Sequence, residues 1–143
     1  MTPHDEDGYT IDVDPDRIDV DRVHHWLSTD AYWALGRERE IVERAIRGSL
    51  NFGVYDANGE QVAYARVITD SVTFAWLCDV YVDRRHRGVG IGRRLVAAVR
   101  DHLASYKIRR IVLATYDAHS LYAEAGFAPL ADPQNWMALI GEG

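Results

Sequence analysis

The chain has 143 residues, of which 48% are hydrophobic and 27% charged, and its formal net charge is −6. This length suits one domain, and the composition excludes a disordered or a fibrous chain. A net negative charge repels the phosphates of nucleic acid and of anionic membranes, so we expect neither as a partner.

The sequence contains no run of about 18 apolar residues, which a membrane-spanning helix requires. The first ten residues are acidic, unlike the basic and then apolar start of a signal peptide. The single cysteine, Cys78, has no partner for an internal disulfide, as is typical of a reducing compartment. We therefore expect a cytoplasmic protein with one domain over residues 1–143, of which residues 1–8 form a mobile tail.

The charge is unevenly distributed along the chain. Residues 1–30 hold nine acidic residues and two arginines, so the rest of the chain carries a charge of about +1. Within that rest, residues 83–94 (DRRHRGVGIGRR) hold five arginines against one aspartate. A run of charge is often only a solvated face. The glycines between these arginines distinguish this run from such a face.

The first third of the chain predicts one strand and two helices. Residues 9–14 alternate like a short, exposed strand. Residues 21–29 predict a helix with Asp21 as its N-cap, and residues 37–49 predict a second helix. The apolar face of the second helix would be formed by Ile41, Val42, Ala45 and Ile46.

A hairpin and a long strand follow these helices. Asn58-Gly59 lies between two runs rich in strand-forming residues, 51–56 and 61–68, and this pattern predicts a hairpin. Residues 71–82 form a long run of apolar, β-branched and aromatic residues, which predicts a central and largely buried strand.

The second half of the chain alternates between helices and strands. We expect an amphipathic helix over residues 90–106, a buried strand over 109–116, a short helix over 118–126 and a last strand over 135–140. The order of elements predicts a mixed α/β domain around one sheet.

The turn between the long strand and the amphipathic helix has the features of an anion site. The first turn of a helix has unpaired N–H groups and partial positive charge, and Gly88, Gly90 and Gly92 would allow a ligand to approach the backbone closely. A diphosphate is the ligand that this arrangement suits. The spacing differs from the phosphate loop of NTPases, which needs Gly-Lys-Ser/Thr, and from the dinucleotide fingerprint Gly-x-Gly-x-x-Gly.

Two segments resemble the GNAT superfamily of N-acetyltransferases. Residues 87–92 (RGVGIG) match its signature Gln/Arg-x-x-Gly-x-Gly/Ala after a buried strand, and residues 118–127 (AHSLYAEAGF) resemble its second motif. The resemblance implies a single GNAT-like domain with a mixed, mostly antiparallel sheet flanked by helices and a splayed strand pair at the cofactor site. It also implies acetyl-CoA as co-substrate, with the diphosphate held by N–H groups of the turn and the pantetheine arm beside the preceding strand. The cofactor-binding residues would be Val80, Tyr81, Val82, Arg87, Gly88, Val89, Gly90, Ile91, Gly92 and Arg93.

The resemblance further implies that Tyr122 protonates the leaving thiolate. Many members have an asparagine seven residues before this tyrosine, where this chain has Thr115. For the base we consider Asp79, because a charged residue inside an apolar strand must be paired or have a raised pKa. The alternatives are that Asp79 pairs with an arginine such as Arg66, caps a turn or binds substrate. The amine could also lose its proton to bulk water without a dedicated base.

The acceptor pocket is predicted less specifically than the cofactor site. Trp26, Tyr32 and Trp33 lie where the family builds this pocket, and they form an aromatic wall for an amine or simply pack in the core. The histidines and Cys78 lack metal-ligand spacing, so we expect no metal.

The sequence therefore predicts an N-acetyltransferase that transfers acetyl from acetyl-CoA to a primary amine of a small molecule or peptide. The alternatives are a protein N-terminal acetyltransferase and a non-catalytic module that senses acyl-CoA. The resemblance also implies a homodimer.

Overall fold

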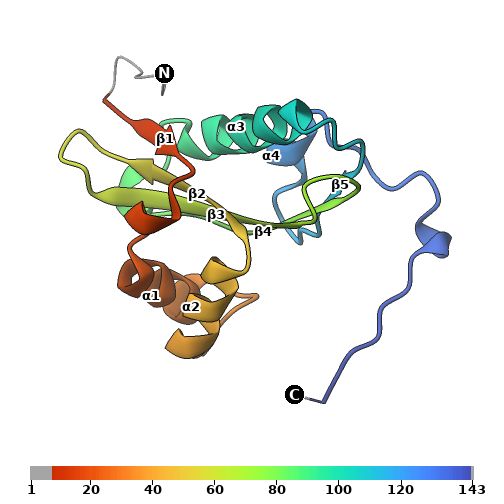
Figure 1. The fold of residues 1–143 in the computed structure, drawn as a ribbon, viewed down its shortest axis with the longest axis horizontal. Coiled ribbons are helices and arrows are strands. Elements are labelled where there is room, and N and C mark those ends of the chain that lie inside the picture. The colour runs from red at the N-terminus through yellow and green to blue at the C-terminus, as the bar shows by residue number, and fades with distance from the viewer. Residues whose placement is uncertain (1–7, 143) are drawn as a thin grey trace.

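A five-stranded sheet runs through the centre of the computed structural model, which describes residues 8–142 (Figure 1). The strands lie in the order β1-β2-β3-β4-β5; the first three pairings are antiparallel, and β4 pairs with β5 in parallel. Their bounds are β1 Thr10–Asp12, β2 Leu50–Tyr55, β3 Gln61–Thr69, β4 Ala75–Val82 and β5 Ile111–Val112. A parallel pair needs a crossover connection, and a helix supplies it here.

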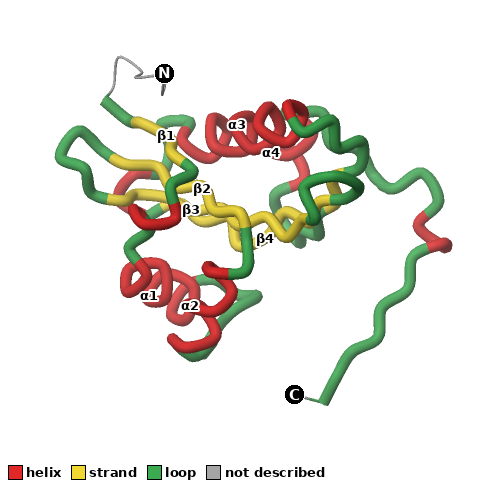
Figure 2. Tube along the Cα trace, in the orientation of Figure 1, coloured by secondary structure: helices red, strands yellow, loops and turns green. Residues whose placement is uncertain are grey.

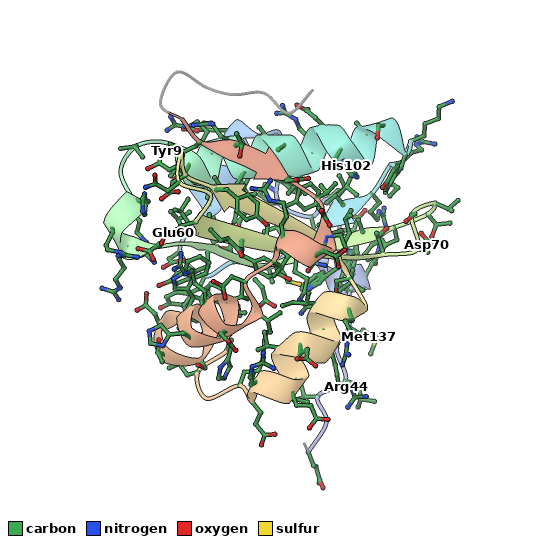
Figure 3. The ribbon with its side chains drawn as sticks, turned by 60° about the vertical axis from the view of Figure 1, so that its left-hand side comes forward. Tyr9, Arg44, Glu60, Asp70, His102 and Met137 are labelled. Carbon is green, nitrogen blue, oxygen red and sulfur yellow. The ribbon has the colours of Figure 1, made fainter. Side chains whose placement is uncertain are left out.

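Helices cover both faces of the sheet (Figure 2). They are α1 Val20–Asp30, α2 Arg39–Arg47, α3 Ile91–Ser105 and α4 His119–Glu124, with 3-10 turns η1 Pro15–Arg17, η2 Arg84–His86 and η3 Pro133–Asn135. Figures 1 and 3, seen from two directions, place α1 and α2 on one face and α3 on the other, where α4 lies beside α3. The predicted class, a mixed and mostly antiparallel sheet flanked by helices, is confirmed.

The predicted hairpin joins β2 to β3. The N–H of Asp56 donates to the carbonyl of Glu60 at 2.9 Å, and Gly59 has a φ of 82°. Asn58 is not among the residues with a positive φ, so the turn is not the type I′ turn in which both central residues are left-handed. Of Asn58 and Gly59, only Gly59 adopts the left-handed conformation that favours glycine.

Two details of the first helices differ from the prediction. The N-cap of α1 is Asp19, whose side chain accepts the N–H of Arg22 at 3.0 Å, so Asp21 lies in the first turn of the helix. In α2, Ile41 is 48% exposed, while Val42 and Ile46 are buried. The helix therefore contacts the sheet along a narrow stripe, and Ile41 lies beyond its edge.

The sheet separates two apolar cores. On the α3 side, Leu95, Val99 and Leu103 pack against Phe52 and Leu77. The second core holds the buried residues of α1 and α2 together with two tyrosines of the sheet: Trp26, Leu27, Val42, Ile46, Tyr64 and Tyr81. Each such side chain contributes about 1.5–3 kcal/mol when it is fully buried, so both faces fix the position of β4 between them.

The end of the chain departs from the prediction. Only Ile111–Val112 of the expected strand 109–116 pairs with the sheet, and no described strand covers residues 135–140. Residues 128–142 instead extend away from the sheet (Figure 1). Their apolar side chains are exposed. A strand needs a neighbour for its backbone groups, and within the described residues 8–142 this segment has none. The expected mobile tail lies, apart from Gly8, outside the described residues.

Candidate active site

A β-bulge in β4 shapes one wall of the candidate site. Asp79 and Val80 together oppose Ala65 of β3, and Asp79 adopts a left-handed φ of 51°. Leu77 and Val80 both contact the core on the α3 side, which a regular strand does not allow for residues three apart. The extra residue therefore turns the side chain of Asp79 toward α1 and α2.

The last two strands of the sheet separate soon after they meet. β4 pairs with β5 only at Ala75↔Ile111 and Trp76↔Val112, so residues 77–82 have no strand partner on that side within the described residues. A cleft of about 800 Å³ opens there, lined by β4, by residues 114–118 and by α4. This is the splayed pair that the sequence predicts.

The glycine-rich turn forms one end of the cleft. Gly88 and Gly90 have φ values of 85° and 87°, and an added Cβ at either position would meet no atom within 4 Å. Gly90 is the N-cap of α3, and its carbonyl accepts the N–H of Arg94 at 3.1 Å. The N–H groups of residues 91–93 precede that bond and have no backbone carbonyl partner in the described chain. The first turn of α3 holds no acidic residue, so its partial positive charge is available to an anion.

The arginines around this turn are largely neutralised by carboxylates. Arg84 and Arg87 pair with Asp30, Arg85 pairs with Asp83, and Arg93 pairs with Glu124. Asp30 also accepts the hydroxyl of Tyr81 at 2.5 Å, and the hydrogen bonds from Arg84 and then Tyr81 lower the pKa of Asp30. Four arginines thus share three carboxylates, so the positive character of the turn comes both from its N–H groups and from a net charge of about +1 among these side chains.

Nine of the ten predicted cofactor-binding residues line the cleft, namely Val80, Tyr81, Val82, Arg87, Gly88, Gly90, Ile91, Gly92 and Arg93. Val89 is not among the lining residues and is 58% exposed. Thr115, at the position where many relatives have asparagine, also lines the cleft.

Asp79 lies at the other end of the cleft and is fully paired. Its Oδ2 accepts Nε of Arg66 at 2.9 Å and Nη1 of Arg37 at 3.0 Å, while its Oδ1 accepts Nε1 of Trp33 at 2.8 Å. Burial alone would raise the pKa of Asp79, but the charges of Arg66 and Arg37 outweigh it and hold that pKa below its ordinary value. This geometry contains the pairing with Arg66 that was one of the alternatives for Asp79.

Tyr122 projects from α4 into the same cleft. Burial raises the pKa of Tyr122 to about 12, and its ring packs edge-on against Phe127. The described residues form no hydrogen bond with its hydroxyl. That hydroxyl is protonated at neutral pH and free to donate to a ligand.

The structure divides the three aromatic residues proposed for the acceptor pocket. Tyr32 and Trp33 line the cleft and pack edge-on at 5.0 Å, and the hydroxyl of Tyr32 accepts the N–H of Tyr116 at 3.2 Å. Trp26 lies outside the cleft, stacked on Tyr81 with its Nε1 donating to Asp83 at 3.2 Å. Trp26 lies on the buried face of α1, at the i+3 position from the buried Val23, and this face packs against the sheet. Tyr32 and Trp33 follow the end of α1 and are not held to that face.

Sequence reasoning missed two charged residues of this cleft, Asp30 and Arg37. Both lie at or after the end of α1, and no motif marks them, because their position depends on how α1 packs against the sheet. Cys78 also lines the cleft, and burial raises the pKa of its thiol to about 11, so it is a poor nucleophile.

The described residues include no group of three or more histidine, cysteine, aspartate or glutamate side chains placed to hold a metal ion. No described helix is long and apolar enough to cross a membrane.

Comparisons with known proteins agree with this geometry. A family model described as the acetyltransferase (GNAT) family matches residues 20–127. The curated "putative acetyltransferase" of Gibberella zeae is 33% identical over 135 residues, which span 81% of this chain and 76% of that protein.

Solved structures share the fold over nearly the whole chain. The crystal structure of a GNAT-family protein from Xanthomonas campestris pv. campestris superposes with a TM-score of 0.88 at 42% identity, covering 99% of this chain and 96% of that chain. N-acetylglutamate synthase from Neisseria gonorrhoeae, complexed with coenzyme A and N-acetyl-glutamate, has a TM-score of 0.71 at 18% identity, covering 91% of this chain and 30% of that chain. The second likeness concerns the fold alone.

Proposed function

Because this chain belongs to the GNAT family of acetyltransferases, we propose that it transfers the acetyl group of acetyl-CoA to a primary amine of a small molecule or peptide. The observation that carries this proposal is the single cleft that joins the glycine-rich turn at one end to Tyr122 and Asp79 at the other. A co-substrate bound by its diphosphate at the turn would extend along β4 toward both side chains.

The residues of the cleft fit acetyl-CoA. The exposed backbone at Gly88 and Gly90 and the N–H groups of residues 91–93 suit the diphosphate, because no side chain of the turn obstructs them. The unpaired edge of β4 at residues 80–82 suits an extended arm that hydrogen-bonds like a strand. Acetyl-CoA bound there would supply an activated thioester carbonyl.

The cleft then positions the acceptor amine for direct attack. A neutral amine forms the new C–N bond while the C–S bond breaks, so no covalent enzyme nucleophile is needed, and positioning supplies much of the acceleration. A backbone N–H near Val80 would stabilise the negative charge that develops on the carbonyl oxygen. Tyr122 would return a proton to the thiolate sulfur.

The proton of the amine needs a separate acceptor. Asp79 is a weak base for this purpose, because three hydrogen bonds occupy its carboxylate and its pKa is lowered. We assign the proton to water in the open cleft and the role of Asp79 to holding Arg37 and Arg66.

A screen of amine acceptors with detection of released thiol tests the function. Amino acids, polyamines, aminoglycosides and short peptides are offered with acetyl-CoA, and we expect turnover with at least one small amine. Acetylation of peptides alone would favour the protein N-terminal acetyltransferase. Binding of acetyl-CoA, seen as protection against thermal unfolding, without any turnover would favour the sensor.

The proposal includes a homodimer built through the C-terminal arm, residues 128–142. Met137, Leu139 and Ile140 of this arm are 97%, 98% and 84% exposed, an arrangement that is costly for a single chain in water. The edge of β5 that faces away from β4 also has no strand neighbour among the described residues. One molecule thus has both an unpaired arm and an unpaired sheet edge.

A further inference from the structure

Two arginines lie at the acceptor end of the cleft, opposite the glycine-rich turn. Arg66 comes from the middle of β3 and Arg37 from the loop between α1 and α2, and both line the cleft. Their side chains are 14% and 24% exposed, so they are shielded from bulk water but open to the cleft. Guanidinium groups in such a place interact strongly with any anion that enters.

The charges at this end of the cleft do not balance. Among the described residues, Asp79, with a side chain only 3% exposed, is the one carboxylate paired with Arg37 and Arg66, so this group of three carries one surplus positive charge. The other carboxylates lining the cleft are Asp30, which pairs with Arg84 and Arg87, and Asp117, which precedes α4. Neither forms an ion pair with Arg37 or Arg66 in the described chain.

Several donors of the two arginines are also free. Arg37 uses Nη1, and Arg66 uses Nε and Nη1, the latter to the hydroxyl of Ser49 at 3.1 Å. Within residues 8–142, Nε and Nη2 of Arg37 and Nη2 of Arg66 have no hydrogen-bond acceptor. These donors are open to the water of the cleft, because none of them is a buried atom without a partner. A ligand that supplies two acceptor oxygens can take the place of that water and form charge-assisted hydrogen bonds.

We propose that Arg37 and Arg66 bind a carboxylate of the acceptor, so that the acceptor is an amino acid with a free carboxyl group. This inference rests on the proposed acetyl transfer. One surplus positive charge matches a monoanion, and a carboxylate is planar with two oxygens, as paired guanidinium donors require. Asp79 is then a positioning residue that orients both arginines, and the edge-on pair Tyr32–Trp33 contacts the acceptor side chain.

The test compares each acid with its neutral counterpart. The twenty proteinogenic L-amino acids and their carboxamides are offered with acetyl-CoA to the full chain, and thiol release is measured. We expect kcat/KM for the best acid to exceed that of its amide by roughly ten- to hundredfold, as a charge-assisted hydrogen-bond pair implies. Arg37→Gln should lower kcat/KM for the acid by a similar factor, and by much more than it lowers kcat/KM for the amide.

A matched control separates this effect from a general loss of charge. Arg47→Gln removes an arginine of α2 whose side chain is 68% exposed and, among the described residues, forms an ion pair only with Glu43. This variant should preserve the preference for the acid. Calorimetry supplies a readout independent of turnover. The N-acetylated form of the best acid should bind the CoA-saturated protein, and Arg37→Gln should weaken that binding at least tenfold.

Each outcome decides the inference. Amides or simple amines that turn over as well as acids would overturn it and leave the proposed acetyl transfer intact. If acetyl-CoA binds but no acceptor turns over, the proposed function fails. Calorimetry with N-acetyl-L-phenylalanine and its carboxamide then tests the proposed carboxylate site independently of turnover. Equal binding of this acid and its amide, or binding of neither, would overturn the proposed carboxylate site. A preference for the acid that disappears in Arg37→Gln would support the site.

Discussion

In the mechanism that we propose, Tyr122 takes its role as general acid from its surroundings. The desolvation that raises its pKa to about 12 keeps the hydroxyl protonated, and the hydroxyl is not engaged by any described residue. A group of this kind donates a proton in the transition state and contributes little to ground-state binding.

Tyr122→Phe should therefore lower kcat by about a hundredfold, the lower end of general-acid effects, and leave acetyl-CoA affinity within a factor of two to three. Steady-state rates and protection against thermal unfolding measure the two quantities. Tyr106→Phe, at the C-cap of α3 and outside the cleft, is the control and should leave both unchanged. An unchanged kcat in Tyr122→Phe would remove this tyrosine from the mechanism.

The lowered pKa of Asp79 should make the free energy of unfolding depend on pH. Its folded pKa is lowered by Arg66 and Arg37, so its contribution is present above its unfolded pKa of about 4 and is lost as pH falls through the folded value. Asp79→Asn leaves two arginines without a buried partner and should cost about 3 kcal/mol at pH 7, the lower end for a buried pair, because both arginines reach the open cleft.

Urea unfolding at several pH values measures this effect. The difference in the free energy of unfolding between wild type and Asp79→Asn should be greatest near pH 7. It should become smaller below about pH 4, where the carboxylate of Asp79 in the unfolded wild type becomes protonated. The exposed Asp101→Asn should show little change at any pH. A difference that stays constant down to pH 2 would contradict the assignment of an ionised Asp79.

The sequence predicted some of these residues and missed others for a physical reason. A carboxylate inside the apolar run 71–82 signals a partner or a ligand, so Asp79 and its pairing with Arg66 were among the alternatives. Arg37 and Asp30 reach the cleft only because α1 packs on the sheet, and local sequence does not record that packing. Trp26 was placed near the pocket by position, yet its helical register directs it into the core.

At the scale of elements, the glycine-rich turn was predictable because its determinants are local. Strand, glycines and helix are adjacent in the chain, and the left-handed φ values of Gly88 and Gly90 satisfy that connection without long-range contacts. The strand predicted over residues 109–116 is longer than the observed β5, because the residues after Val112 have the hydrophobic character of a strand. The backbone after Val112 is not paired with β4, because the two strands separate there.

Gly90→Glu tests the turn directly. It places a carboxylate at the N-cap of α3, facing the proposed diphosphate, and should abolish protection by acetyl-CoA against thermal unfolding. Gly59→Glu is a matched control, because Gly59 has a similar φ of 82° and similarly open space but lies at the hairpin turn. Both variants should lose about 1 kcal/mol of stability to backbone strain, and only the first should lose the protection. Retained protection in Gly90→Glu would contradict the diphosphate site.

At the scale of the whole molecule, the C-terminal arm is the feature that a single chain does not explain. The sequence predicts a strand over 135–140, and the structure shows an extended segment with suitable side chains but no neighbour. The ring of Trp136 lies 5.7 Å from Arg110, the residue before β5, so the middle of the arm is still beside its own domain (Figure 3 labels Met137, the next residue). A reciprocal exchange of arms around a two-fold axis would pair each arm with the β5 edge of the other copy and close the assembly.

Light scattering with size-exclusion chromatography should therefore give the wild type twice the mass of one chain. Leu139→Asp together with Ile140→Asp should give a monomer, because burial of each such side chain stabilises an interface by about 1.5–3 kcal/mol and a buried, unpaired carboxylate opposes it. Ile41→Asp is the control, since Ile41 is 48% exposed on α2 and lies outside the sheet edge that β5 forms. A wild-type monomer at tens of micromolar, or a dimer that survives the double substitution, would show that the arm does not join two copies. If the dimer forms, the six-residue strand predicted from sequence exists after all, and its neighbour is supplied by a second chain.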